Sequence, residues 1–173
     1  MTVDVQDLAD KLAIQETLAR YCRGIDRCDL ETLKSAFWPD AVSVYGDTPL
    51  NAQAWAEGVL ARLAEMLRTQ HAISNIIIDL KGEPGAHRLA LSETYCRAYH
   101  EVEAHGVREE MMVGGRYLDR FEKRGGEWRI IHRTYVMDFN QNGPSTSKWD
   151  GPMYGRLTLT GARYPHDWLY TNH

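Results

Sequence analysis

The spacing of apolar residues changes once along this chain, near His71, from the period of a helix to that of a strand. Before this point, apolar positions recur every three or four residues over residues 5–25, 29–38 and 51–68, which predicts three amphipathic helices. The run AVSVYGD, residues 41–47, predicts one short strand between the second and third helices. Helices therefore come first in the chain, and we expect the sheet on which they pack to follow.

Beyond His71, four segments rich in β-branched and aromatic residues predict strands, over residues 74–80, 88–102, 108–123 and 127–140. The segments between them are short and rich in glycine, which predicts antiparallel hairpins with little room for crossover helices. The adjacent Gly114 and Gly115 predict a bend or bulge within the third strand. We therefore expect an α+β fold, a cone-shaped, curled, mixed or antiparallel sheet wrapped around the N-terminal helices, whose open end could hold a ligand.

Length and charge limit the kind of molecule. A chain of 173 residues, of which 43% are hydrophobic, can bury one core, and we assign that domain to residues 1–140. The 20 Lys and Arg residues face 24 Asp and Glu, without a run of like charge, so nothing in the sequence indicates binding to nucleic acid or an anionic membrane. Because no apolar run is long enough to span a bilayer, we expect a cytoplasmic protein with a small-molecule partner.

The three cysteines, Cys22, Cys28 and Cys96, argue against a disulfide framework and a zinc site. Their number is odd, and neither a CxxC pair nor a histidine pair at ligand spacing accompanies them. We expect no metal and no cofactor.

Residues 141–173 begin as a polar loop and continue as an aromatic tail, which contains Trp149, Tyr154, Tyr164, Trp168 and Tyr170. Exposed apolar patches usually mark contacts, so we expect this tail to pack on the same domain or on a neighbouring subunit. The alternative is a lid over the mouth of a cavity.

Three stretches of the sequence resemble one known family. They are IQETLARYCRGIDRCDLETLKSAFWPDAVSVYG (14–46), QHAISNI (70–76) and EWRIIHRTYVMDF (127–139), and the likeness covers roughly residues 8–140. They are similar to the SnoaL-like branch of the nuclear transport factor 2-like superfamily, which includes scytalone dehydratase, lindane dehydrochlorinase, bile-acid 7α-dehydratase and ketosteroid isomerase. The resemblance implies the cystatin-like α+β roll of that superfamily and leaves the reaction open, because one fold hosts many chemistries.

The resemblance also implies a catalytic dyad of Asp26 and His71. In the dehydrochlorinase and the dehydratases, an aspartate at the end of the first helix hydrogen-bonds a histidine at the start of the first long strand, and the histidine abstracts a proton. Arg133 matches an arginine on the last strand of the dehydrochlorinase, whereas Tyr21 stands where that enzyme has a lysine, as a tyrosine does in some of the dehydratases. This difference favours an oxygen leaving group or a carbonyl oxygen, which a phenol can hydrogen-bond.

These residue types suit general acid–base chemistry. A neutral imidazole can accept a proton near working pH, and an ionised Asp26 would fix the tautomer of His71 and stabilise its imidazolium. Tyr21 and Tyr45 are candidate hydrogen-bond donors to the substrate, together with the fixed charge of Arg133. The expected walls of the cavity are aromatic or apolar and suit a flat ring: Trp38, Tyr95, Met112 and Tyr135.

Each candidate also has a structural interpretation. Asp26 alone could be a residue that ends a helix, and His71 alone could cap a helix C-terminus. Arg133 could form a salt bridge with Glu93 or Asp138 across the sheet.

The sequence therefore predicts a cofactor-independent, dehydratase-type lyase of aromatic compound metabolism that acts on a small aromatic or polycyclic hydroxylated substrate. Three alternatives stay open: a carbon–carbon lyase that releases formaldehyde from an aryl propanediol, an isomerase that shuttles a proton, and a non-catalytic binding module such as the small subunit of a ring dioxygenase. Because the outer face of the curled sheet needs cover, we expect a homo-oligomer, and the resemblance favours a trimer over a dimer.

Overall fold

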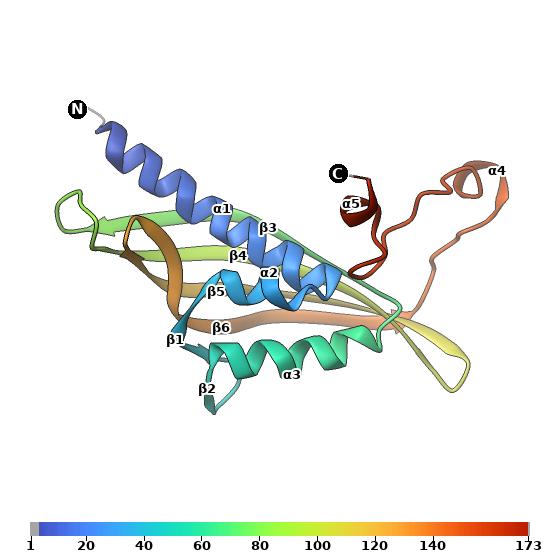
Figure 1. Ribbon diagram of the computed structural model, residues 1–173. Coiled ribbons are helices and arrows are strands. Elements are labelled where there is room, and N and C mark those ends of the chain that lie inside the picture. The colour runs from blue at the N-terminus through green and yellow to red at the C-terminus, as the bar shows by residue number, and fades with distance from the viewer. Residues whose placement is uncertain (1–3, 173) are drawn as a thin grey trace.

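The computed structural model describes residues 4–172, which form one sheet with three helices packed against one face (Figure 1). These three helices are α1 (Val5–Arg27), α2 (Leu30–Ser35) and α3 (Ala52–Ala64). The tail adds the short helices α4 (Gly151–Tyr154) and α5 (Trp168–Thr171). The strands are β1 (Phe37–Val44), β2 (Pro49–Asn51), β3 (Arg68–Lys81), β4 (Arg88–Ala104), β5 (Val107–Arg124) and β6 (Glu127–Pro144). Residues 1–3 and 173, the ends of the predicted domain and tail, lie outside the described part. No helix within residues 4–172 is long and apolar enough to cross a membrane.

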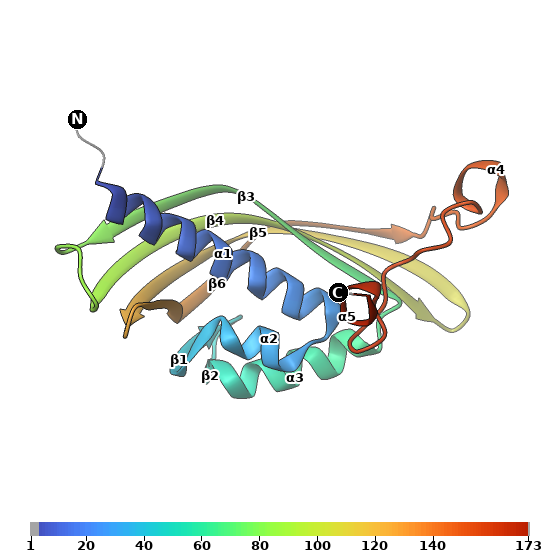
Figure 2. The ribbon, with the colours of Figure 1, turned by 45° about the horizontal axis from the view of Figure 1, so that its top comes forward.

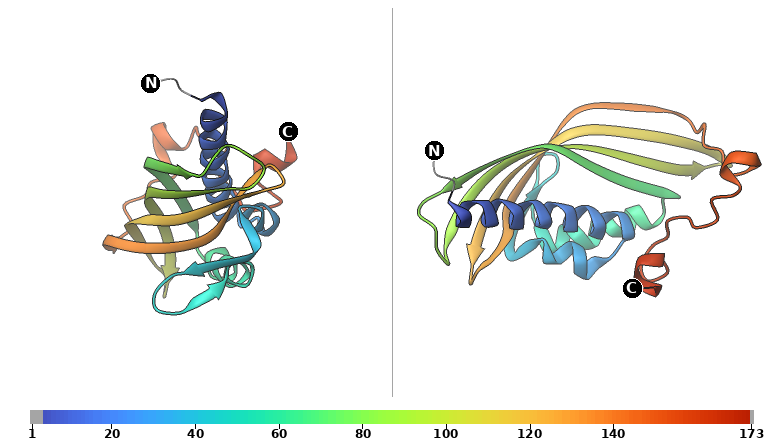
Figure 3. Two further views of the ribbon diagram at one scale, coloured as in Figure 1. Left: turned by 90° about the vertical axis from the view of Figure 1, so that its left-hand side faces the viewer. Right: turned by 90° about the horizontal axis from the view of Figure 1, so that it is seen from above.

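The strands are arranged in the order β2-β1-β6-β5-β4-β3. Neighbouring strands are antiparallel except for β1 and β6, which run parallel, so the sheet is mixed. The long strands β3 to β6 curl over α1 and α3 (Figure 2, Figure 3). This arrangement confirms the expected α+β fold. β3 lies at an edge of the sheet, so the N–H groups on its outer side have no neighbouring strand to bond.

The bend predicted at Gly114 and Gly115 lies where strand pairing slips. The register between β5 and β6 shifts between these two residues. A Cβ atom on Gly115 would lie 2.3 Å from the carbonyl oxygen of Val136, and one on Gly114 would lie 2.1 Å from the ring of Phe139. Gly115 therefore needs to be glycine, because the backbone of the neighbouring strand approaches more closely than a side chain allows, whereas at Gly114 the obstacle is the ring of Phe139.

The buried face of α1 near its N-terminus differs from the one that apolar spacing indicates. Leu8 and Leu12 are 51% and 57% exposed, and Asp10 is buried instead. Its carboxylate accepts hydrogen bonds from Arg88 at 3.1 Å and Lys123 at 2.8 Å. Burial alone would raise the pKa of Asp10, but the bonds from these cations lower it to about 2. A cluster of charges thus holds the first turns of α1 to the sheet.

The second helix is shorter than predicted, because Phe37 and Trp38 begin β1 instead of ending the helix. Pro39 has no N–H group and disfavours a helical conformation in the residue before it, so the chain is extended at Trp38. Phe37 pairs with Ile130 of β6, which places its ring in the core.

The third helix and the first long strand also meet earlier than predicted. α3 ends at Ala64 and β3 begins at Arg68, so His71 lies inside a strand. This position removes the interpretation of His71 as a helix cap. The three-residue strand β2 has no counterpart among the predicted elements, since it is too short to show alternation.

The tail leaves the sheet after β6 and returns to the C-terminal end of α1. The ring of Trp149 still lies against Arg68 of β3, at 3.7 Å, and the segment around α4 then extends away from the body before the chain turns back (Figure 1). The backbone N–H of Tyr164 then donates to the carbonyl oxygen of Arg27 at 2.6 Å, and the hydroxyl of Tyr170 donates to Oδ2 of Asp29 at 2.9 Å. The last part of the tail therefore contacts the end of the first helix in the same chain.

Candidate active site

Asp26 and His71 form a hydrogen-bonded pair between α1 and β3. Oδ1 of Asp26 lies 2.7 Å from Nδ1 of His71, and Oδ2 accepts the backbone N–H of His71 at 2.8 Å. The second bond is available because β3 is an edge strand and this N–H has no strand beside it. The side chains of Asp26 and His71 are only 10% and 7% exposed. One carboxylate thus holds both the ring and the main chain of His71.

The bond to Nδ1 determines which ring nitrogen can react. An ionised carboxylate accepts the proton of Nδ1, so the free lone pair of the neutral ring lies on Nε2. His71 lines a cavity in the concave side of the sheet. Its free nitrogen can therefore accept a proton from a molecule bound there.

The cavity has a volume of about 190 Å³ and is mostly aromatic. Its aromatic walls are Tyr21, Tyr45, Trp55, Tyr117 and Tyr135. Smaller apolar side chains complete the lining: Ile25, Val59, Leu63, Cys96, Ala98 and Val113. Besides His71, the side chains that can carry a positive charge in this lining are those of His100 and Arg62. The site can therefore hold a flat, largely apolar molecule against a base.

Two phenols meet in the cavity wall. The hydroxyl groups of Tyr21 and Tyr45 lie 2.8 Å apart, and the ring of Tyr45 is stacked between those of Trp55 and Tyr135, with centroids 4.6 and 5.2 Å away. Burial raises the pKa of Tyr21 to about 12, although the charge of Arg133 opposes this, and burial raises that of Tyr45 well above 10. Both phenols are therefore protonated at neutral pH and can donate hydrogen bonds.

Arg133 lies behind the tyrosines and does not line the cavity. Its guanidinium is fully buried and pairs with Asp119, with Nε to Oδ1 at 2.7 Å and Nη2 to Oδ2 at 2.6 Å. The guanidinium carbon lies 4.1 Å from the ring centre of Tyr21 and 3.9 Å from that of Tyr117. Arg133 therefore acts on the cavity through these rings.

The acidic residues considered as partners of Arg133 are engaged elsewhere. Glu93 and Asp138 pair with Arg116, at 3.8 and 3.0 Å. Arg116 is adjacent to the inward-facing Tyr117, so it points to the outer face of the sheet. The prediction of a salt bridge between Arg133 and either acid is therefore wrong. Arg133 lies on the inner face of the sheet, and both acids pair with Arg116 on the outer face.

Three of the expected wall residues do not line the cavity: Trp38, Tyr95 and Met112. Nε1–H of Trp38 donates to the carbonyl oxygen of Glu122 at 2.9 Å, away from the dyad. Tyr95 is 44% exposed, and Met112 is adjacent to Val113, which lines the cavity. Adjacent residues of a strand point to opposite faces, so Met112 points outward.

Tyr117 and His100 are among the lining residues that were not identified from the sequence. Tyr117 pairs directly with Tyr135 across β5 and β6, so a correct strand register would have revealed it. His100 lies two residues after Ala98 on β4 and shares its inner face. In both cases the available signal is strand alternation.

The ring of His100 lies perpendicular to that of His71, with centroids 5.5 Å apart. Burial, together with the proximity of His71, lowers the pKa of His100 to about 4. Its Nδ1 is buried and has no hydrogen-bond partner among the described residues. At neutral pH the cavity therefore contains a second, uncharged imidazole.

Across residues 4–172, no group of three or more His, Cys, Asp or Glu side chains is arranged to share a metal ion.

Comparisons with known proteins agree with this architecture. A putative scytalone dehydratase from Novosphingobium aromaticivorans is 21% identical, with a TM-score of 0.69 over 79% of this chain and 89% of that one. A hexachlorocyclohexane dehydrochlorinase, LinA-type3, from Novosphingobium barchaimii is 18% identical, with a TM-score of 0.63 over 87% and 99%. The Kfla4162 protein from Kribbella flavida is 16% identical, with a TM-score of 0.68 over 78% and 95%. At these identities the likeness shows a shared fold.

No curated protein matches this sequence. The family model of the SnoaL-like domain, however, matches residues 6–134, which contain nearly all of α1, the whole of α2 and α3 and most of the sheet. This match and the shared fold confirm the resemblance seen in the sequence, and the chain belongs to the SnoaL-like family.

Proposed function

We propose that this chain is a cofactor-independent lyase that eliminates water from a small ring compound bearing a hydroxyl group. The observation that carries the proposal is the 2.7 Å contact between Oδ1 of Asp26 and Nδ1 of His71 at the wall of an aromatic cavity. Family membership supports it, as do the dehydratase and the dehydrochlorinase among the similar structures, since both names denote eliminations.

In the proposed reaction, Nε2 of His71 takes a proton from the carbon next to a carbonyl group. The electron pair of that C–H bond moves onto the carbonyl group to give an enolate, and the collapse of the enolate forms a carbon–carbon double bond while the C–O bond to the hydroxyl group breaks. The leaving hydroxide takes the proton back from Nε2 and departs as water, so His71 ends neutral. Asp26 stabilises the imidazolium that exists between the two transfers.

Tyr21 and Tyr45 serve as one hydrogen-bond relay, in which one phenol donates to the other, whose own proton is free for the carbonyl oxygen. Negative charge develops on that oxygen as the proton leaves carbon. Both phenols keep their protons at neutral pH, because burial raises the pKa of each. The guanidinium of Arg133 packs against the ring of Tyr21 and adds a fixed positive charge behind it. The charge of the enolate is thus met by groups already in place.

The size and shape of the cavity favour a single ring. A protein cavity of about 150 Å³ is known to hold benzene, and this one measures about 190 Å³. Part of its wall is an aromatic stack, in which the ring of Tyr45 packs between those of Trp55 and Tyr135, at 16° and 15°. A single six-membered ring with one or two oxygen substituents suits this volume better than a polycyclic compound.

The first test is turnover of 3-hydroxycyclohexanone, a single-ring β-hydroxy ketone, to cyclohexenone and water. The unmodified protein should form the enone, and His71→Ala should abolish its formation while the circular dichroism spectrum stays the same. His87→Ala, which changes an exposed histidine in a turn, is the matched control and should keep full activity. Turnover by His71→Ala at the unmodified rate would refute the proposal.

The product separates elimination from the other reactions that the same base could start. Loss of water lowers the mass of the substrate, whereas isomerisation leaves it unchanged. Carbon–carbon cleavage of an aryl propanediol would instead release formaldehyde, which a colorimetric assay detects. A binding module would turn over none of these compounds and would copurify with a larger subunit.

We also propose that the protein is a homo-oligomer, with a trimer favoured over a dimer. The outer face of β4 and β5 exposes Leu91, Tyr95 and Leu118, at 47%, 44% and 37%. Apolar side chains grouped on one face usually mark a contact surface. Light scattering should give a mass above that of one chain, and Leu91→Asp should lower it.

A further inference from the structure

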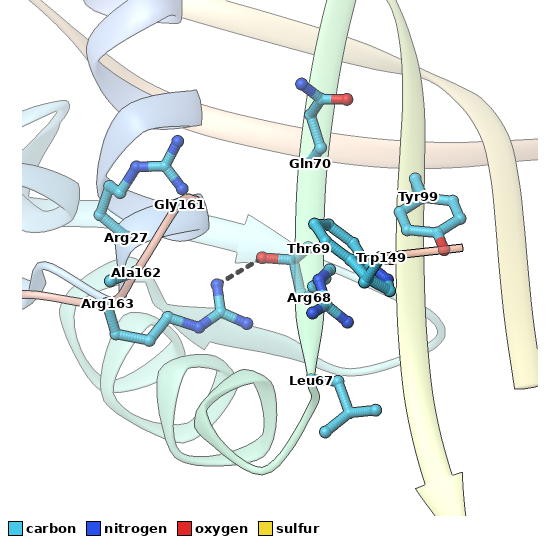
Figure 4. A pocket seen from close by; sticks show the side chains of 10 residues that line it. All are labelled: Arg27, Leu67, Arg68, Thr69, Gln70, Tyr99, Trp149, Gly161, Ala162 and Arg163. Atoms are coloured by element: carbon cyan, nitrogen blue, oxygen red, sulfur yellow. Dashed lines mark hydrogen bonds between the residues drawn. The ribbon is translucent and has the colours of Figure 1, made fainter. Parts of the chain in front are cut away.

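Arg163, in the tail, bonds to three segments that meet beside the dyad. Its Nη1 donates to the main-chain oxygen of Asp26 and, at 2.7 Å, to Oγ1 of Thr69. Its Nη2 donates to the carbonyl oxygens of Leu63 at 3.1 Å and Met66 at 3.5 Å. Figure 4 shows this guanidinium reaching from the tail to the side chain of Thr69 on β3. One side chain therefore connects the end of α1, the end of α3 and the start of β3.

The carbonyl groups that Arg163 contacts are of the kind that helices leave without partners. The last four carbonyls of a helix lack internal donors and carry the negative end of its dipole. In α1, the tail supplies donors to two of them, because Tyr164 N–H bonds to Arg27 and Arg163 bonds to Asp26. A guanidinium suits this place, since it is always charged and offers five N–H groups in a plane.

The same contacts reach both members of the dyad. Asp26 is bonded through its backbone to Arg163 and through its carboxylate to His71. Thr69 lies two residues before His71 on β3, so the two side chains point to the same face of the strand. The position of one guanidinium thus influences the residue that holds the base and the strand that carries it.

We propose that Arg163 is a positioning residue that sets the geometry of the Asp26–His71 pair, so that docking of the tail governs the activity of the site. Arg163 does not line the cavity of the dyad, so it acts without touching substrate. The kinetic part of this inference depends on the proposed lyase function, whereas the geometric part does not.

A second cavity, of about 350 Å³, provides a direct way to test this role. It lies between the tail and β3, and Arg163 forms part of its wall (Figure 4). Arg163→Ala would leave a space beside the two helix ends that is open to this cavity. A guanidinium ion could enter there and take up the bonds of the missing side chain.

With 3-hydroxycyclohexanone as substrate, Arg163→Ala should lower kcat roughly 10- to 100-fold, as expected for a base displaced by about 1 Å. KM should stay within about twofold, because no group that lines the cavity is changed. Guanidinium chloride, well below denaturing concentrations, should restore part of kcat. Arg156→Ala is the matched control, since Arg156 is exposed in the same tail and forms no bond or ion pair within residues 4–172. It should match the unmodified protein with and without guanidinium.

A measurement without substrate tests the geometric part. The backbone N–H of His71 donates to Asp26, so its hydrogen exchange reports on the pair. In Arg163→Ala this exchange should be at least about tenfold faster, the effect of losing a hydrogen bond to a charged group, while amides in the middle of β5 keep their rates. Arg163→Lys, which keeps the charge but not the planar fork, should lie between the two.

The outcomes separate the two proposals. If the exchange of His71 N–H and kcat are both unchanged in Arg163→Ala, the positioning role is refuted. If 3-hydroxycyclohexanone is not turned over by any variant but the exchange of His71 N–H still accelerates, the positioning role stands and this substrate for the lyase is refuted. Should Arg163→Ala fail to fold, the exchange measured in Arg163→Lys decides the question in the same way.

Discussion

The carboxylate of Asp26 bonds to His71 twice, to ring Nδ1 at 2.7 Å and to the backbone N–H at 2.8 Å. The two residues are 45 positions apart in the chain. The imidazole ring of His71 has little freedom to rotate, because the carboxylate of Asp26 bonds both to its Nδ1 and to the backbone that carries it. Nε2 is therefore presented in one direction, and this order is established when the chain folds, before any substrate binds.

Asp26→Asn should lower kcat about 100- to 10,000-fold without unfolding the protein. The amide NH₂ would donate to Nδ1 of His71 and so place the proton on Nε2, where it blocks the base. Turnover and circular dichroism measure the two effects. Asp4→Asn is the control, because this exposed carboxylate caps the start of α1 through the N–H of Gln6, at 2.8 Å, and should affect the melting temperature alone. Equal turnover by both variants would contradict the proposed role of Asp26.

Tyr21→Phe and Tyr45→Phe should each lower kcat, and their effects should not add. The two hydroxyl groups form one hydrogen bond of 2.8 Å, so either change removes it. In a double-mutant cycle the coupling should be about 0.5–3 kcal/mol for residues in direct contact. Tyr95→Phe, on the outer face of the sheet, should leave kcat unchanged. Additive losses would show that the two phenols act independently.

Arg133→Gln should reduce the free energy of unfolding by about 3–5 kcal/mol, because it leaves the carboxylate of Asp119 buried without its partner. Urea denaturation measures this change. Arg116→Gln breaks an ion pair with Asp138 near the surface and should cost less than about 1 kcal/mol. A similar small loss in Arg133→Gln would mean that water reaches Asp119.

The stability of the protein should fall between pH 6.5 and pH 4 because of His100. Its pKa in the folded chain is lowered to about 4 from 6.5, chiefly by burial, so the unfolded chain takes up a proton first as the pH decreases. The stabilisation is complete above pH 6.5 and is lost as the pH falls through the folded pKa. After allowance for partial exposure to solvent, the loss should be about 1–2 kcal/mol.

His100→Gln should remove that part of the pH dependence, whereas the exposed His87→Gln should not. Unfolding by urea at a series of pH values compares the three proteins. An unchanged slope in His100→Gln would show that this imidazole is not buried in its neutral form.

The order of helices and strands could be predicted because each long strand is bounded by glycine-rich turns. The positions of Asp26 and His71 could also be predicted, since the motifs around them match a family. The contacts of Arg163 could not, because 137 residues separate it from Asp26 and no local pattern connects the two.

The walls of the cavity were harder to predict, for a reason visible in β4. Leu91 and Tyr95 are large and apolar but lie on the outer face, at 47% and 44% exposed, whereas Ser92 and Thr94 are buried. Alternation shows that a strand has two faces but not which face the helices cover. When the covered face carries the smaller and more polar residues, hydrophobicity assigns the wrong one, and Tyr95 was misplaced in this way.

A slip in strand pairing adds a second obstacle in β3. Its register against β4 shifts between Ser74 and Ile77, and Asn75 there has a φ of 48°. A shift of this kind exchanges the two faces of a strand. The alternation of inward- and outward-facing side chains, counted from one end of β3, therefore does not hold at the other end.

The helix α1 carries a buried carboxylate near each end, Asp10 and Asp26, about 24 Å apart along its axis. Asp10 is satisfied by cations of the sheet and takes no part in the cavity. The anchoring of the helix and the chemistry at its far end are therefore separate. A chain built in this way can change the chemistry at one end of α1 through successive generations without disturbing the charged contacts that hold the other end to the sheet.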